Sequence, residues 1–147
     1  MSGVEARVVA EARDWLGTPY RHQASRKGAG ADCLGLIRGI WRALYGAEPE
    51  AVPPYSMDWS EPARDEVLWR AAGRHLRPKD REEATLGDVV LFRMRDGSVA
   101  KHLGVVTQTG SQAKFVHAYS GHGVVESSLT NAWRRRIVAR FAFPEEI

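Results

Sequence analysis

The sequence predicts an α+β protein in which N-terminal helices pack on an antiparallel sheet of five or six strands. Two observations support this fold class. The first half of the 147-residue chain carries apolar residues at helical spacing, whereas the second half carries short β-type runs separated by turn residues. Helices followed by consecutive strands are typical of an α+β domain, and not of a sheet built from alternating βαβ units.

Three amphipathic helices are predicted. The first spans residues 4–16 and ends at Gly17, Thr18 and Pro19, and the second begins at Cys33 and ends before Gly46, which suits a left-handed C-terminal cap. Between them, residues 21–31 indicate a loop. The apolar stripes of these two helices consist of Val4, Val8, Ala12, Trp15 and Leu16, and of Leu36, Ile37, Ile40, Trp41 and Leu44.

The third helix follows an extended connection that contains Pro49, Pro53 and Pro54. Its start is indicated by Ser60, Glu61 and Pro62, ahead of the apolar positions Val67, Leu68, Ala71, Ala72 and Leu76. Beyond Gly87 and Asp88 the pattern changes to strands, because β-branched and aromatic runs alternate with glycine-containing turns. The predicted strands are residues 89–93, 103–109, 114–119, 124–127 and 137–143.

The composition is that of one ordinary water-soluble domain, residues 1–147, with 44% hydrophobic and 27% charged residues. The longest apolar runs are far shorter than the ~20 residues of a membrane helix, and charged residues interrupt the only N-terminal stretch that resembles a secretion signal. The net charge of +3 comes mostly from scattered arginines. We therefore expect no membrane span, no signal peptide and no direct role with nucleic acid, although a basic enzyme can be attracted to an anionic cell wall.

The single cysteine, Cys33, excludes an internal disulfide and a multi-cysteine zinc site. Its position in the first turn of the second helix predicts a lowered thiol pKa, because unpaired backbone N–H groups and the helix dipole stabilise a thiolate. Isolated cysteines are also common as small buried hydrophobes. The neighbours of Cys33 must therefore decide between nucleophile and core residue.

Two of the five histidines, His102 and His117, lie in adjacent predicted strands joined by a short turn. A two- or four-residue turn at 109–112 pairs residues whose numbers sum to an odd value, as these two do, so both imidazoles point to one face of the sheet. We expect the second helix to pack its cysteine end on that face, so that Cys33 meets His102 and His117 holds the other nitrogen of His102. The small residues Gly35, Gly39 and Gly104 would permit this approach.

Other interpretations remain open at this point. Strand histidines are often hydrogen-bonded scaffold, and two histidines with one cysteine can ligate zinc, although no H-E-x-x-H or C-x-x-C context accompanies them. We predict no metal and no cofactor. The other histidines, His22, His75 and His122, are expected at the surface, where His22 or His122 can line a cleft.

Five short motifs, in order and with compatible spacing over residues 5–130, resemble the NlpC/P60 cysteine peptidases. They are residues 17–21 (GTPYR), 32–36 (DCLGL), 87–92 (GDVVLF), 101–106 (KHLGVV) and 115–118 (FVHA). More narrowly, residues 21–36 resemble the single-domain branch of this family that is encoded with phage tails and gene transfer agents. The resemblance implies a papain-like core and cleavage of an amide bond in peptidoglycan stem peptides through a thioester intermediate.

The resemblance also implies roles for individual residues. Cys33 would be the nucleophile, His102 the general base and His117 the third polar residue. In the same way, Tyr20 would line the active site or contact the oxyanion, and Asp32 would be an acid on the substrate side. Where the family usually has serine, this chain has Leu34, which removes a hydroxyl from the substrate side.

The branch implies partners and a location as well. The protein would be made in the bacterial cytoplasm, carried in a phage-like tail with tail or baseplate proteins, and act on the cell wall in the periplasm to aid DNA entry. Two alternatives keep the fold but change the function. One is a structural tail protein without turnover, and the other is a Cys-His acyltransferase or amidase.

Overall fold

The computed structural model describes residues 3–52, 55 and 66–145, and it confirms the α+β fold class. The helices are α1 (Gly3–Asp14), α2 (Cys33–Tyr45), α3 (Val67–His75) and α4 (Asn131–Arg134). The strands are β1 (Ser25–Arg26), β2 (Gly30–Ala31), β3 (Arg77–Lys79), β4 (Val89–Phe92), β5 (His102–Gln108), β6 (Lys114–Tyr119), β7 (Gly123–Ser128) and β8 (Ile137–Ala142). Within the described residues, no helix has the length and apolar character needed to cross a bilayer.

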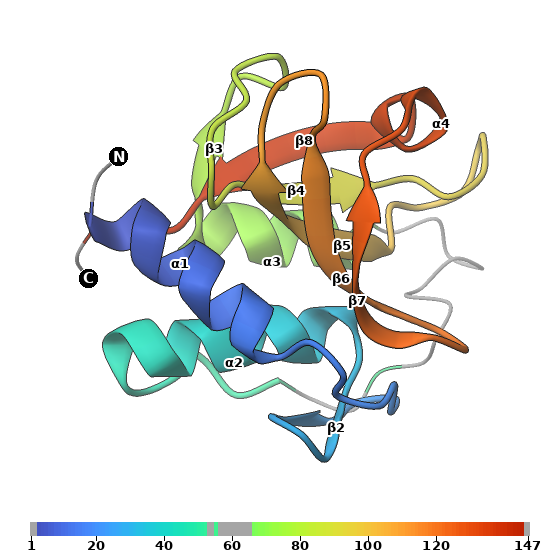
Figure 1. Ribbon diagram of the computed structural model, residues 1–147. Helices are drawn as coiled ribbons and strands as arrows, with labels where there is room; N and C mark the ends of the chain where they lie inside the picture. The colour runs from blue at the N-terminus through green and yellow to red at the C-terminus, as the bar shows by residue number, and fades with distance from the viewer. Residues whose placement is uncertain (1–2, 53–54, 56–65, 146–147) are drawn as a thin grey trace.

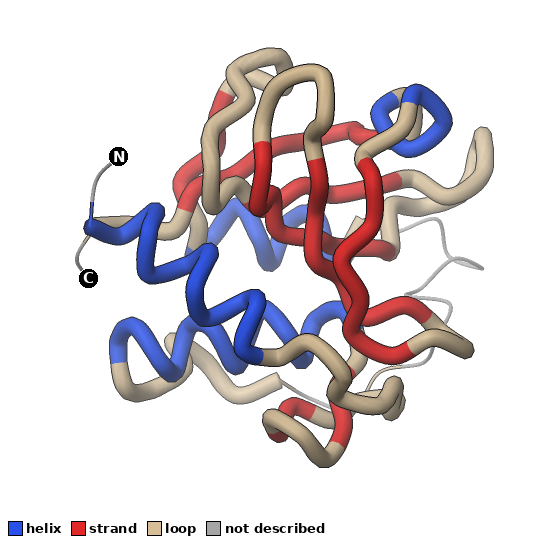
Figure 2. The backbone as a smooth tube through the Cα atoms, in the orientation of Figure 1, coloured by secondary structure: helices blue, strands red, loops and turns tan. Residues whose placement is uncertain are grey.

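Six strands form one sheet in the order β3-β8-β4-β5-β6-β7, with every neighbouring pair antiparallel. The two short strands β1 and β2 form a separate hairpin, set apart from this sheet (Figure 2). The five predicted strands are present to within two residues at either end. The sequence pattern missed β1, β2 and β3, because two or three residues are too few to show an alternation of faces.

The sheet separates two apolar clusters. Helices α1 and α2 lie along one side of it in Figure 1, and together with α3 they supply the larger cluster. Alternate strand residues face these helices, among them Leu91, Leu103, Val105, Val116 and Phe141. The smaller cluster lies on the other face, where Trp133 of α4 packs against Val90, Phe92, Val106, Phe115 and Ile137.

The second helix is formed as predicted, from Cys33 to a C-terminal cap at Gly46. Gly46 has φ of +95°, a backbone conformation that side-chain-bearing residues rarely adopt, and its N–H donates to the Arg42 carbonyl. The fully buried Leu36 and Ile40 hold the helix on the sheet.

Two glycines of α2 serve contacts other than the predicted one. A side chain at Gly39 would overlap the ring of Trp15, and one at Gly35 would overlap the Ala24 carbonyl. These positions therefore admit Trp15, which follows α1, and the loop before α2. The prediction that they allow close approach to the sheet was wrong.

The first helix ends at Asp14, earlier than predicted, and Leu16 is 41% exposed instead of lying on the apolar stripe. After the helix the chain turns toward the edge strand β7. There the Gly17 N–H donates to the Val124 carbonyl (3.0 Å), and the Val124 N–H donates to the Thr18 carbonyl (2.8 Å). This pairing places the residues that precede Tyr20 beside β7.

The third helix is present from Val67 to His75, with Glu66 at its N-cap position. The predicted start signal at residues 60–62 lies outside the described residues, as do Pro53 and Pro54.

A buried carboxylate ties together the strands at the end of the sheet. Asp88, 2% exposed, accepts hydrogen bonds from Lys79 Nζ (2.8 Å), Arg140 Nη1 (2.9 Å) and the Thr85 N–H (2.7 Å). Arg140 is itself buried, so the two charges depend on each other for compensation. This cluster joins β3 and β8 to the turn that starts β4.

Removal of this carboxylate is expected to destabilise the fold strongly. The change Asp88→Ala should lower the free energy of unfolding by about 3–5 kcal/mol, because it leaves Arg140 buried without its counter-charge. Asp96→Ala, at an exposed turn carboxylate, is the matched control and should change stability by less than about 0.5 kcal/mol. Urea unfolding measures both, and equal stabilities of the two variants would contradict the assignment.

Candidate active site

Cys33 is the first residue of α2, and Asp32 immediately before it caps the helix. The Asp32 side chain accepts a hydrogen bond from the Gly35 N–H (2.7 Å), as an N-cap residue does. The backbone N–H groups at this helix start have no partner within the helix. The predicted position of the cysteine in the first turn is therefore confirmed.

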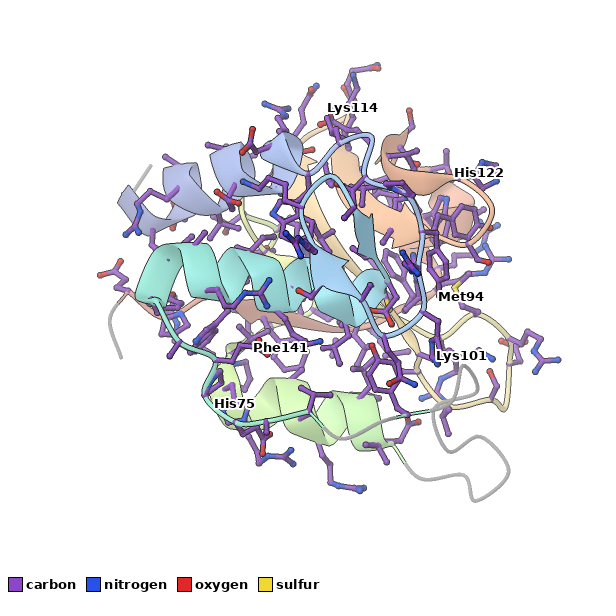
Figure 3. All side chains as sticks on the ribbon, turned by 90° about the horizontal axis from the view of Figure 1, so that it is seen from below. His75, Met94, Lys101, Lys114, His122 and Phe141 are labelled. Carbon is purple, nitrogen blue, oxygen red and sulfur yellow. The ribbon has the colours of Figure 1, made fainter. Side chains whose placement is uncertain are left out.

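The sulfur of Cys33 lies against the backbone at the start of β5. Its thiol donates to the Lys101 carbonyl (3.7 Å), and the N–H of Leu103 also points to the sulfur. Cys33 and His102 line the same small cleft, which has a volume of about 130 Å³. The other lining residues are Tyr20, His22, Asp32, Met94, Lys101, Ala118, Tyr119 and Ser120. In Figure 3, Met94, Lys101 and His122 lie toward the side where α2 begins, and His75 lies near its other end.

The predicted pairing of the histidines is confirmed. Val105 pairs with Val116, so the residue numbers of paired positions sum to an odd value, and the register shifts only beyond Val106. His102 and His117 are therefore diagonal neighbours on one face, with His102 Nε2 and His117 Nδ1 2.8 Å apart.

This face is not the one on which α2 packs, so that part of the prediction was wrong. Both imidazoles contact Trp133 of α4, while Leu103 and Val116, which face the other way, contact the helices. Gly104 also faces away from α2, where an added Cβ would lie 2.7 Å from the Phe115 ring. Cys33 still reaches His102, because His102 is the first residue of β5 and the helix start lies beside that strand end.

Burial keeps both imidazoles neutral. It lowers the pKa of His102 to about 3, with a smaller contribution from His117. It also lowers the pKa of His117 to about 4, with a smaller contribution from His122. Near neutral pH each ring therefore carries one proton, and its other nitrogen is an acceptor.

The thiol does not follow the prediction of a lowered pKa. Burial, together with the charge of Asp32, raises the pKa of Cys33 to about 12, although the N–H groups of Leu103, Leu34 and Cys33 act in the opposite direction. Desolvation of the thiolate outweighs the helix terminus here. The resting pair is thus a thiol beside a neutral imidazole.

The Asp32 carboxylate has several partners within the protein. Besides the Gly35 N–H, it accepts from the Gln23 N–H (2.7 Å) and from the Tyr55 hydroxyl, and His22 Nδ1 lies 3.8 Å away. Asp32 is 3% exposed, so its carboxylate is committed mainly to holding the loop and the helix start.

The Tyr20 phenol remains protonated in this setting. Burial raises the pKa of Tyr20 to about 12, with smaller electrostatic contributions from Cys33 and Asp32. Tyr20 lines the cleft of Cys33, and its protonated hydroxyl keeps an O–H that can donate a hydrogen bond.

Leu34 lies in a different place from the other predicted site residues. Its side chain lines a larger, mainly apolar cavity of about 570 Å³ between α2 and α3, and not the cleft of Cys33. His75 lines the same cavity, half-buried, with Nε2 2.8 Å from the Glu50 carboxylate. His75 was predicted at the surface.

Two residues at or near the site, Ser127 and Tyr55, were not predicted as part of it. His22, expected at the surface where it can line a cleft, does line the cleft of Cys33, and its Nε2 donates to the Tyr55 carbonyl (2.8 Å). Ser127 of β7 contacts His117 Nε2 through its hydroxyl (2.9 Å). A tight turn at residues 120–122, with alternation along both strands, places Ser127 on the same face of the sheet as His117, so this residue could have been predicted. No sequence signal brings Tyr55 to Asp32. Within the described ranges, no group of three or more His, Cys, Asp or Glu side chains is arranged to hold a metal ion.

Comparisons with known proteins give two curated relatives from Escherichia coli K12. The chain is 30% identical, over 134 residues, to the murein DD-endopeptidase MepS/murein LD-carboxypeptidase of Escherichia coli K12, a match that covers 90% of this chain and 60% of that protein. It is 28% identical over 121 residues to the probable endopeptidase NlpC of the same strain, covering 82% of this chain and 66% of the relative. The chain thus spans about three fifths to two thirds of these relatives.

Solved structures share the fold. The NlpC/p60 domain of the peptidoglycan hydrolase SagA superposes with a TM-score of 0.62 at 19% identity, covering 95% of this chain and 98% of that domain. An NLP/P60 protein from Staphylococcus aureus Mu50 gives 0.61 at 18% identity, covering 99% of this chain and 43% of its own. The sequence profile of the NlpC/P60 family matches residues 17–141. The chain therefore belongs to the NlpC/P60 family.

Proposed function

We propose that the protein is a cysteine endopeptidase that hydrolyses an amide bond in peptidoglycan stem peptides. One observation carries this proposal: Cys33, at the capped start of α2, shares a cleft with His102, whose far nitrogen contacts the buried His117. A nucleophile, a base and a group that orients the base are the elements that acyl transfer needs.

Attack and proton transfer are coupled in this mechanism, because the resting thiol is protonated. His102 Nδ1 takes the proton of Cys33 as the sulfur attacks the amide carbonyl carbon. The tetrahedral intermediate then collapses to a thioester, and His102 gives its proton to the leaving amine. In the second half, His102 removes a proton from water and the resulting hydroxide attacks the thioester. The C–S bond then breaks to release the acid product, and the departing sulfur takes the proton back from His102, which restores the thiol.

The oxyanion of both tetrahedral intermediates needs donors beside the sulfur. We assign this role to the N–H groups of Cys33 and Leu34, at the start of α2, and to the hydroxyl of Tyr20, which lines the same cleft. The role of Asp32 in this proposal is indirect, because its carboxylate holds the helix start. Leu34 would act through its backbone N–H, with its side chain in the neighbouring cavity.

The substrate class is supported by the relatives. The name of the MepS relative gives murein as the substrate of that protein and two activities, a DD-endopeptidase and an LD-carboxypeptidase. Separated muropeptides distinguish these two reactions, because an endopeptidase divides a cross-linked dimer whereas a carboxypeptidase releases a terminal amino acid.

The activity is expected to depend on the two residues at the centre of the cleft. In a digest of purified muropeptides, Cys33→Ala should abolish the appearance of new amine termini. His102→Ala should reduce kcat by about 10²–10⁴-fold, because it removes the general base. The exposed His122→Ala serves as the matched control and should keep most of the activity. Equal numbers of new amine termini from wild type and Cys33→Ala would contradict the proposal.

The thiol is expected to react slowly at neutral pH. With a pKa raised by burial to about 12, the thiolate fraction at pH 7 is roughly three orders of magnitude below that of a free thiol, and it keeps rising with pH. Alkylation by iodoacetamide, followed by mass spectrometry, should therefore accelerate through pH 9 without a plateau. Asp32→Asn should raise the rate at fixed pH, because it removes a charge that opposes the thiolate.

The urea-unfolded chain is the control for that measurement, since its cysteine should titrate near ~8.5. A plateau below pH 8 in the folded protein would mean that a thiolate-imidazolium pair exists before substrate binds. Proton transfer would then precede attack.

We also propose that the protein works as part of a phage-like tail, on the basis of residues 21–36. Particles that carry Cys33→Ala should then assemble normally and bind cells but deliver DNA poorly. Infection counts and electron micrographs of wild-type and variant particles measure this. Full DNA delivery by the variant particles would favour a structural tail protein without turnover.

A further inference from the structure

Three polar side chains form a row across the sheet, starting at the cleft. His102 on β5 contacts His117 on β6 (Nε2 to Nδ1, 2.8 Å), and His117 contacts Ser127 on β7 (Nε2 to Oγ, 2.9 Å). Each step is the same diagonal, because Val105 pairs with Val116 and Phe115 pairs with Ser127. The row therefore connects His102, at the cleft, to a residue on the edge strand β7.

The middle member of the row is sealed by aromatic rings. His117 is fully buried, with ring centroids of Phe115 at 4.2 Å, Tyr119 at 5.2 Å and Trp133 at 5.3 Å, the last in a T-shaped arrangement. Among the described residues, its two nitrogens have hydrogen-bond contacts with His102 and Ser127 alone. The protonation site on His117 is thus decided by these two partners.

Only one arrangement of protons leaves His102 able to act as a base. If Nδ1 of His102 is to accept the thiol proton, its own proton must sit on Nε2, which then donates to His117 Nδ1. His117 must in turn carry its proton on Nε2, and this N–H needs an acceptor. The Ser127 hydroxyl is that acceptor.

The reverse arrangement would disable the site. A proton on His117 Nδ1 would be donated to His102 Nε2, and His102 would then carry its own proton on Nδ1, toward the thiol. Ser127 is half-buried on the edge strand, so its hydroxyl proton can turn to water while a lone pair faces His117.

We infer that Ser127 is a positioning residue that accepts the Nε2 proton of His117 and so keeps Nδ1 of His102 free for the Cys33 thiol. This inference rests on the proposed peptidase function. Other titratable groups face the row, and their contributions to a pH profile have to be separated from that of Ser127. At the cleft they are Cys33, Asp32, His22 and Lys101. Beside His117 they are Tyr119, whose ring stacks on that of His117, and His122, whose ring stacks on that of Tyr119.

The test compares wild type with Ser127→Ala, with Ser127→Thr, which keeps a hydroxyl, and with Ser127→Asp, whose carboxylate can only accept. Ser128→Ala, at the exposed neighbour on β7, is the matched control. Nitrogen NMR of histidine-labelled protein reports which ring nitrogens carry protons, and it does so without substrate. Muropeptide kinetics over a range of pH give kcat and KM separately.

In Ser127→Ala, His117 should lose its single tautomer and kcat should fall about tenfold with KM unchanged, in line with the loss of one hydrogen bond. Ser127→Thr should restore both readouts. Ser127→Asp should keep the tautomer and move the pH profile upward, because its charge favours protonated imidazole.

Wild-type tautomers and wild-type kcat in Ser127→Ala, equal to those of Ser128→Ala, would overturn the inference. A changed tautomer in Ser127→Ala would support the inference even if the wild-type protein cleaved no muropeptide, and that inactivity would count against the proposed function alone. The NMR readout thus separates the two proposals.

Discussion

The carboxylate of Asp32 is the interaction on which the arrangement of the site depends. It caps α2 through Gly35, holds the preceding loop through the Gln23 N–H, and receives the Tyr55 hydroxyl from a distant segment. Three separate pieces of chain are therefore fixed around the residue before Cys33. This order has an electrostatic cost, because a buried negative charge beside the sulfur opposes formation of a thiolate.

The two faces of the sheet hold different parts of the site. The face toward α1, α2 and α3 is apolar and holds the helix that carries Cys33, whereas the opposite face holds the imidazoles under Trp133. Cys33 and His102, the proposed nucleophile and base, meet only at the strand end, where both faces are within reach. Burial on the imidazole side keeps the rings neutral, which suits the proposed role of His102 as a base that accepts a proton at the moment of attack.

Much of this arrangement could be predicted from the sequence, because helix spacing and strand alternation are local patterns. The helix from Cys33 to Gly46 and the shared face of His102 and His117 follow from them. Alternation does not say which face a helix will cover, so α2 was assigned to the imidazole face. The contact of Tyr55 with Asp32 joins residues 23 positions apart through a proline-rich connection, and no periodicity reports such a contact.

The pairing of Gly17 and Thr18 with Val124 has a consequence for the behaviour of the protein in solution. It places the backbone of Gly17 and Thr18 along part of the edge strand β7, whose backbone donors and acceptors would otherwise be open to another molecule. Gly123 is part of this cover, since a side chain there would lie 2.7 Å from the Thr18 carbonyl. The segment that leads to Tyr20 thus also blocks part of the β7 edge from pairing with the sheet of another molecule.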